Sequence, residues 1–126
     1  MKAEFNNNQP IYQQIIDRVL LSIAKGELTP GEKMKSVRDL AIELKVNPNT
    51  MQKALAKLED MGYLYTERTS GRFVTQDIQQ IEKLKTRLPT QITTNYIAEM
   101  QACGISLDGI VKYFNEALSK GVSSNE

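Results

Sequence analysis

The stretch VNPNTMQKALAKLEDMG, residues 46–62, decides the fold. Asn47 is a favourable N-cap, and Pro48 in the first turn loses no hydrogen bond, because its position has no intrahelical acceptor. Gly62 predicts a left-handed stop at the carboxyl end. Apolar side chains recur between these signals at three- and four-residue spacing and predict one buried helix face, formed by Met51, Leu55 and Leu58 with Ala54 on its flank.

The amino-terminal tip of this helix carries more polar residues than a start signal requires. At about 100° per residue, Asn49 and Lys53 point opposite the apolar face, while Thr50 and Gln52 lie on its shoulders. In the major groove of DNA, Asn and Gln pair with adenine, Thr contacts a thymine methyl group or a phosphate, and Lys reaches guanine or a phosphate. On this pattern alone, the alternative that these side chains are merely solvated stays open.

The neighbouring segments predict a mainly α winged helix-turn-helix with a small β-hairpin wing. Residues 10–27 and 36–45 show helical periodicity, and Ser36 is a good N-cap with Asp39 three positions later. A connection of two residues then leads into the helix that opened this section. Residues 63–76, YLYTERTSGRFVTQ, place strand formers on both sides of a TSG tip, as a short hairpin requires.

The remaining chain is a helical tail, so we expect a DNA-binding domain at residues 1–76 and a dimerisation segment at residues 77–126. Pro89 interrupts the apolar repeat and predicts a kinked or divided helix. Two helices of this length bury too little apolar surface to be stable alone, so they must pack on the first domain or on a second copy of the chain. The candidate dimerisation residues are Ile92, Tyr96, Met100, Ile110, Phe114 and Leu118.

Composition excludes several classes of function. The 126 residues include no histidine and one cysteine, which removes His-dependent acid–base catalysis, Ser-His-Asp and Cys-His nucleophiles and soft-metal sites. We therefore expect no enzyme and no metal or other cofactor. Because the chain has no apolar run of membrane-spanning length and no signal-peptide core in MKAEFNNNQ, we expect a cytoplasmic protein without a membrane partner.

Positive charge is concentrated in one region, although the net charge is only +1. Residues 33–57 contain six basic and two acidic side chains, a local balance of +4, and Arg68 and Arg72 follow at the hairpin. Such a distribution is expected where one surface meets a polyanion. On charge alone, a solvated lysine-rich face explains it equally well.

Residues 10–75 resemble the DNA-binding domain of the GntR family of bacterial transcriptional regulators, through IYQQI, GELTPGEKM, SVRDLA, VNPNTMQKAL, LEDMGYL and GRFV in one register. The short helical tail is similar to the YtrA-like subfamily. The resemblance implies a homodimer that represses transcription from a palindromic operator in double-stranded DNA. Together with the charge pattern it gives these candidate DNA-binding residues: Lys35, Ser36, Arg38, Asn47, Asn49, Thr50, Gln52, Lys53, Lys57, Arg68, Ser70, Gly71 and Arg72.

The sequence departs from the family pattern at several of these positions. Lys35 stands where a proline is common, and Pro48 where many relatives have a base-contacting arginine, so a relative's operator cannot be assumed. Thr69 stands where relatives have a wing glycine and Arg72 where they have a small residue, so the reach of the wing cannot be taken from relatives. Arg38 matches an arginine that reaches DNA, with an ion pair to Glu43 or Asp39 as the alternative.

Two other classes of function remain open at this stage. A winged helix also serves as a protein–protein interaction module, in which case its basic surface would bind no duplex. The tail could instead enclose a small-molecule pocket and make the protein a ligand-gated regulator. The sequence identifies no effector, because no convergent polar cluster marks such a pocket.

Overall fold

The computed structural model describes residues 4–121 and divides into two compact units, Met1–Thr86 and Arg87–Glu126. The division falls ten residues later than the expected boundary after residue 76, because the first turns of the following helix belong to the first unit. Ile81 and Leu84 are buried there, and Gln80 Nε2 donates to the Met61 carbonyl oxygen at 3.1 Å.

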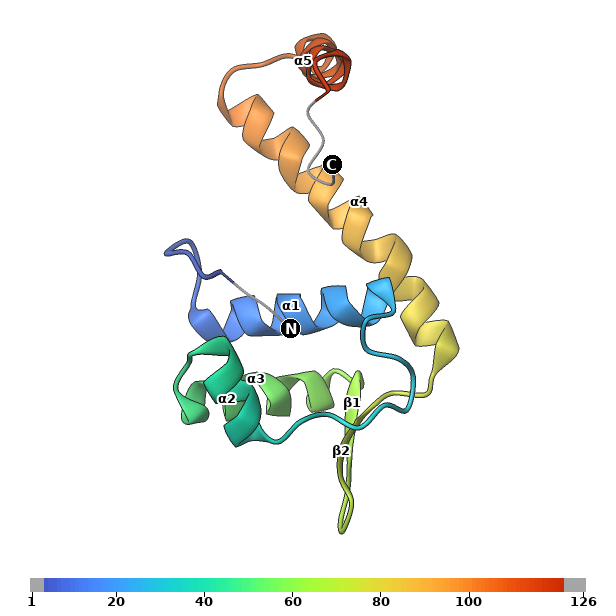
Figure 1. Cartoon of the computed structure of the whole chain (residues 1–126). Coiled ribbons are helices and arrows are strands. Elements are labelled where there is room, and N and C mark those ends of the chain that lie inside the picture. Colours follow the sequence, from blue (N-terminus) through green and yellow to red (C-terminus); the bar gives the residue numbers. More distant parts are fainter. Residues whose placement is uncertain (1–3, 122–126) are drawn as a thin grey trace. The chain divides into compact units, whose positions relative to one another are not determined.

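The first unit contains three helices, α1 (Ile11–Lys25), α2 (Val37–Leu44) and α3 (Pro48–Asp60), followed by a hairpin. α1 and α3 lie side by side (Figure 1). The apolar stripes predicted from the sequence meet in one core, whose buried side chains include Ile15, Ile16, Val19, Ile23, Met51, Leu55 and Leu58.

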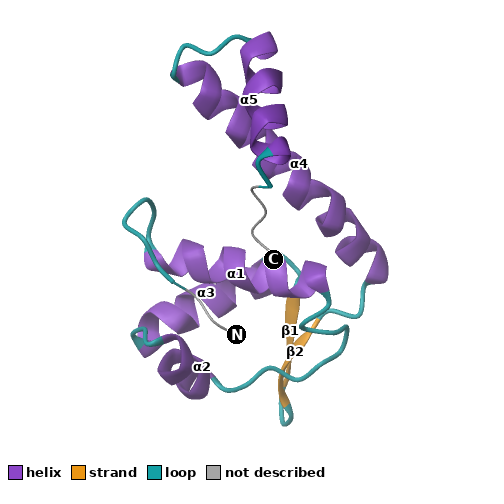
Figure 2. Ribbon diagram, turned by 45° about the horizontal axis from the view of Figure 1, so that its top comes forward, coloured by secondary structure: helices purple, strands orange, loops and turns teal. Residues whose placement is uncertain are grey.

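The predicted hairpin consists of β1 (Leu64–Glu67) and β2 (Gly71–Val74), paired antiparallel (Figure 2). A further segment pairs with β2, and no sequence pattern had indicated it. Lys33 forms an isolated antiparallel bridge with Phe73, and Met34 N donates to the Arg72 carbonyl oxygen at 2.8 Å. The chain before α2 is therefore tied to the wing by backbone hydrogen bonds.

Helix caps follow the predictions. Ser36 Oγ accepts from Asp39 N at 3.0 Å, and Asn47 Oδ1 accepts from Asn49 N at 2.7 Å. Both bonds satisfy amide groups that have no partner within a helix. Gly62 has a φ of +87°, as the predicted left-handed stop requires.

The tail contains α4 (Ile78–Ala102) and α5 (Leu107–Ser119). Of the two outcomes expected at Pro89, a divided helix is wrong, because α4 continues through this residue, and a kink stays a prediction. Proline removes one backbone donor, and the exposed residues 85–87 leave water free to replace it. α5 is capped by Ser106 Oγ, which accepts from Gly109 N at 3.2 Å. None of the helices described has the combined length and apolarity of a membrane span.

Candidate nucleic-acid interface

The amino-terminal tip of α3 is presented to solvent. Asn49, Gln52 and Lys53 are exposed, and Thr50 is half-buried. The buried face behind them holds the helix in place through Met51, which is 1% exposed. The tip therefore offers amide, hydroxyl and ammonium groups on a rigid support, as direct readout of base edges requires.

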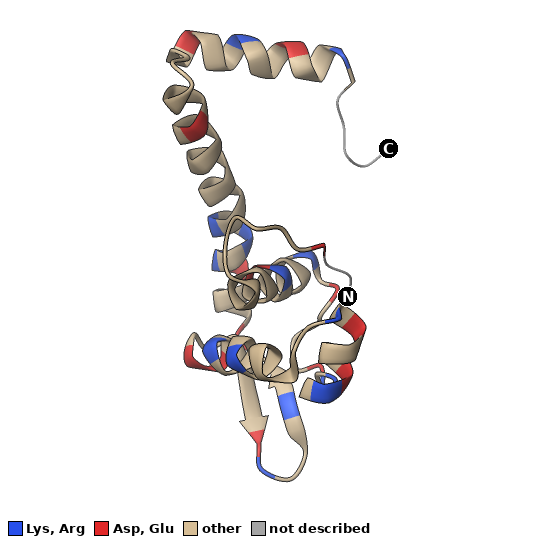
Figure 3. Ribbon diagram, turned by 90° about the vertical axis from the view of Figure 1, so that its left-hand side faces the viewer, with Lys and Arg blue, Asp and Glu red and all other residues tan. Residues whose placement is uncertain are grey.

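A basic groove lies beside this tip, between the chain before α2, the α3 residue Gln52 and the hairpin. Its volume is about 540 Å³. All the charged side chains recorded along its walls are cations, namely Lys33, Lys35, Arg68 and Arg72. Figure 3 shows Lys and Arg in the hairpin and on the helices of the same unit. This groove suits a phosphate backbone better than a neutral ligand.

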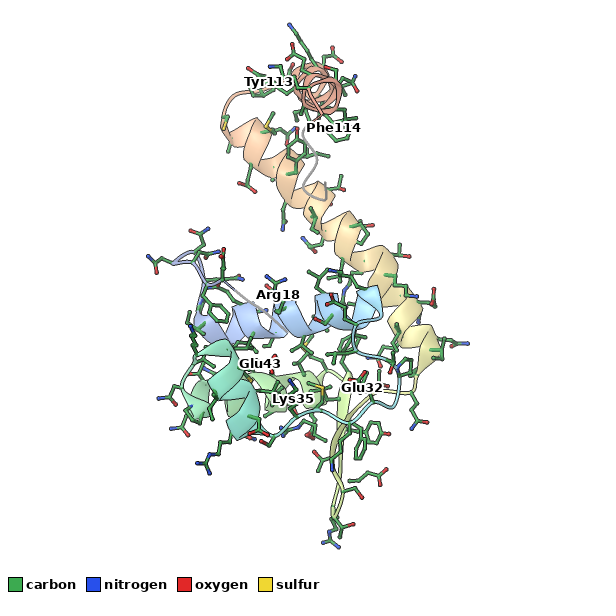
Figure 4. The ribbon with its side chains drawn as sticks, viewed as in Figure 1. Arg18, Glu32, Lys35, Glu43, Tyr113 and Phe114 are labelled. Atoms are coloured by element: carbon green, nitrogen blue, oxygen red, sulfur yellow. The ribbon has the colours of Figure 1, made fainter. Side chains whose placement is uncertain are left out.

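Lys35 is held by a carboxylate of its own chain. Its Nζ lies 2.6 Å from Glu43 Oε1, and the two side chains lie close together in Figure 4. The hydrogen bond to Glu43 raises the pKa of Lys35, and the same bond lowers the pKa of Glu43. A phosphate contact by Lys35 would have to compete with this pair.

A second carboxylate, Glu59 on α3, anchors the wing. Arg72 Nε lies 2.9 Å from Glu59 Oε1, and the Thr66 hydroxyl donates to the same oxygen. These hydrogen bonds, that of Thr66 first, hold the pKa of Glu59 below its ordinary value. The Arg72 side chain is 18% exposed, so it is directed at α3 more than at solvent. Its DNA contact stays a prediction.

The tip of the hairpin depends on Gly71. Its φ of +117° is unfavourable for any residue with a side chain, and an added Cβ would lie 3.2 Å from Lys33 Cε. The absence of a side chain at Gly71 therefore leaves room for the side chain of Lys33 against the hairpin backbone. The family resemblance made Gly71 a candidate DNA-binding residue, and the structure adds this contact within the chain.

The other predicted contact residues lie on exposed surface. Arg38 is exposed on α2, and Glu43, one of its expected alternative partners, is paired with Lys35 instead. Lys57 is exposed on the second half of α3. Arg68 and Ser70 are exposed at the hairpin tip. Ser36 and Asn47 are exposed as well, although both side chains already cap helices.

Four of the six predicted dimerisation residues, Ile92, Tyr96, Ile110 and Phe114, line an apolar groove of about 550 Å³ between α4 and α5 in the second unit, whereas Met100 and Leu118 are not part of its lining. Ile92 and Phe114 line it and are 65% and 51% exposed, whereas Ile110 is buried at 6% exposure. Leu118 is 58% exposed nearby on α5. Figure 4 shows Phe114 and its neighbour Tyr113 leaving α5 in different directions, so apolar groups cover more than one face of this helix.

One contact at the tip of α3 was not expected. Lys53 Nζ lies 3.9 Å from the centroid of the Tyr12 ring on α1. Tyr12 lies in the first turn of α1, and its side chain is half-buried. Within residues 4–121, no group of three or more acidic, cysteine or histidine side chains is arranged to hold a metal ion.

Comparison with known proteins places this arrangement in a family. The sequence profile described as "Bacterial regulatory proteins, gntR family" matches residues 11–74. The uncharacterized HTH-type transcriptional regulator YhcF of Bacillus subtilis is 35% identical over 120 residues, covering 92% of this chain and 98% of YhcF. The HTH-type transcriptional repressor YtrA of the same organism is 31% identical over 124 residues, covering 95% of each protein.

Solved structures show the same fold. A GntR family transcriptional regulator from Listeria monocytogenes superposes with a TM-score of 0.79 at 38% identity, covering 89% of this chain and 98% of that one. AraR(DBD), in a crystal structure with operator ORX1, superposes with a TM-score of 0.53 at 26% identity. That match covers 57% of this chain and 93% of AraR(DBD).

Proposed function

Because this chain belongs to the GntR family of bacterial regulatory proteins, we propose that it binds double-stranded DNA in a sequence-specific manner and represses transcription. The observation that carries this proposal is the exposed polar tip of α3 beside a groove walled by cations. Two similar proteins support the proposal: AraR(DBD), whose crystal structure contains operator ORX1, and YtrA, which is described as a transcriptional repressor. Such a protein would work in the cytoplasm, where bacterial DNA lies.

Each part of the surface has a distinct task in this proposal. The tip of α3 enters the major groove, where Asn49 and Gln52 pair with base edges. The cations of the neighbouring groove neutralise phosphates and give affinity that falls as salt rises. The hairpin tip, with Arg68 and Ser70 exposed, follows the adjacent backbone toward the minor groove.

We further propose that a second copy of the chain covers the apolar groove of α4 and α5. Exposed apolar side chains lie both in the lining of the groove, as Val111 at 58%, and outside it, as Leu118 at 58%. Contiguous apolar surface of this kind marks protein interfaces. An open groove with apolar surroundings suits a partner helix better than an enclosed small ligand. Dimer symmetry would place two α3 helices about 34 Å apart, in successive major grooves.

Selection of bound sites from random duplexes by the full purified chain tests the proposal. We expect enrichment of a palindrome whose half-sites are centred about one helical turn apart. Failure to retain any duplex at low salt would refute DNA binding and favour a protein–protein module. Enrichment of single half-sites without symmetry would refute the proposed dimer while leaving the DNA-binding role intact.

A further inference from the structure

The contact between Lys53 and Tyr12 fixes a lysine that would otherwise move freely. A lysine side chain on a helix surface samples many rotamers, and an ammonium group over an aromatic ring is attracted to the ring's negative face. The Nζ of Lys53 lies 3.9 Å from the ring centroid. The ring therefore favours one placement of an exposed charge at the tip of α3.

That placement directs Lys53 away from the groove beside the wing. Gln52 lines this groove, whereas Lys53 is one residue further around α3 and contacts α1. When a helix occupies the major groove, the side chains on its flanks face the phosphates of the groove walls. Because its ammonium group is held to one flank of α3, against α1, Lys53 is directed at phosphates more than at base edges.

The first turn of α1 is itself well anchored. Gln14 is 9% exposed, and its Nε2 donates to the carbonyl oxygens of Asn6 and Gln9 at 2.8 and 2.7 Å. Asn6 N donates in return to Gln14 Oε1 at 3.0 Å. Ile15 and Ile16, which follow, are buried in the core. The ring of Tyr12 is consequently carried by a fixed backbone.

We propose that Tyr12 is a positioning residue, which holds Lys53 as a phosphate contact beside the base-reading side chains. Lys53 then contributes affinity for any sequence, while Asn49 and Gln52 supply the discrimination between sequences. This inference rests on the proposed function, because it assigns roles within the same DNA-binding surface. It resolves the two sequence-based alternatives for Lys53, guanine or phosphate, in favour of phosphate.

A double-mutant cycle on DNA affinity tests the positioning. Lys53→Met should weaken binding to the selected site and to a random duplex by the same factor, and should reduce the salt slope by about 0.9. Tyr12→Leu should weaken binding about two- to five-fold, with no further loss in the Lys53→Met background. Tyr12→Phe keeps the ring and should retain the affinity of the native chain.

A matched control uses Lys57, an exposed lysine of the same helix for which no ring contact is recorded among the described residues. The effects of Tyr12→Leu and Lys57→Met should multiply. The proposal is overturned if Tyr12→Leu is equally harmful with and without Lys53. It is also overturned if Lys53→Met impairs only the selected site, since that is the behaviour of a base contact.

A measurement on the free protein separates this inference from the proposed function. The ε-methylene protons of Lys53 should resonate upfield of those of Lys57, because they lie over the ring, and Tyr12→Leu should abolish the difference. If no upfield shift is present in the native chain, the positioning role is wrong whatever the protein binds. If the shift is present but no duplex is retained, the contact exists and the proposed function fails instead. The native spectrum decides this even if Tyr12→Leu does not fold.

Discussion

Glu59→Gln should loosen the wing from α3 and remove a pH-dependent part of the stability. Glu59 accepts from both Arg72 and Thr66, and the side chains of Glu59 and Arg72 are only 27% and 18% exposed. A hydrogen bond to a charged group contributes about 1.5–3 kcal/mol when well shielded. Partial exposure lowers this, and glutamine still accepts one of the two bonds, so we expect a loss of about 1 kcal/mol at pH 7.

The pH dependence has a definite sign. The folded-state pKa of Glu59 is lowered, so its contribution is fully present above the unfolded pKa of about 4.3 and is lost as pH falls through the folded value. The gap in stability between native chain and Glu59→Gln should therefore be largest near neutral pH. It should close as pH falls below about 4.

Thermal unfolding of the full chain across this pH range is the assay. A loss of 1 kcal/mol corresponds to a fall in Tm of about 4–8 °C for a unit of this size. Asp60→Asn is the matched control, because Asp60 is an exposed acid next along α3 and its replacement should change little. An unchanged Tm at pH 7, or a deficit that persists undiminished at pH 3, would refute the anchoring role of Glu59.

Three further predictions address the glycine of the wing, the division of roles on α3, and the tail. Gly71→Ala should cost about 1–3 kcal/mol of stability and also weaken DNA binding. The control Gly26→Ala, at a φ of +82° with open space around it, should cost about 1–2 kcal/mol and leave DNA affinity unchanged. Denaturant melts measure the stability of each variant, and titrations of labelled duplex measure its affinity. Gln52→Ala should cost about 1–3 kcal/mol of discrimination at one base position, while Lys57→Ala should weaken all sequences alike, and equal losses on selected and random duplexes for both would contradict this sorting. Leu118→Ser should convert dimer to monomer in sedimentation velocity without lowering the Tm of the first unit, and a dimer that survives would exclude this part of α5 from the interface.

The helices could be predicted because their signals are local. Apolar side chains at helical spacing, the caps Ser36 and Asn47 and the stop at Gly62 each act within a few residues, and each lies where the sequence indicated. The polar tip of α3 followed from the same reasoning, since the side opposite a buried stripe must be exposed. The boundary of the first unit was harder to predict, because the burial of Leu84 depends on a surface built from other helices and strands.

The electrostatic organisation of the site could not be predicted, because its pairs join distant residues. Glu59 and Arg72 are thirteen positions apart, Lys35 and Glu43 eight, and Tyr12 and Lys53 lie on different helices. No periodicity brings such residues together. A count of charges along the chain shows where cations are concentrated, but it does not show which of them already have a partner.

These pairs change what the basic surface is expected to do. Two of the four cations that line the groove, Lys35 and Arg72, contact carboxylates of their own chain, so a phosphate must displace or share an existing bond to engage them. The number of counterions released on binding should then be smaller than the number of cations near the groove, and the salt slope correspondingly shallower. Lys33 and Arg68 carry no ion pair recorded in the described part of the chain, so non-specific attraction should fall mainly to them, to Lys53 and to Lys57. Weak attraction to arbitrary sequence raises the ratio of specific to non-specific binding, and that ratio governs how well a regulator finds one operator among many competing sites.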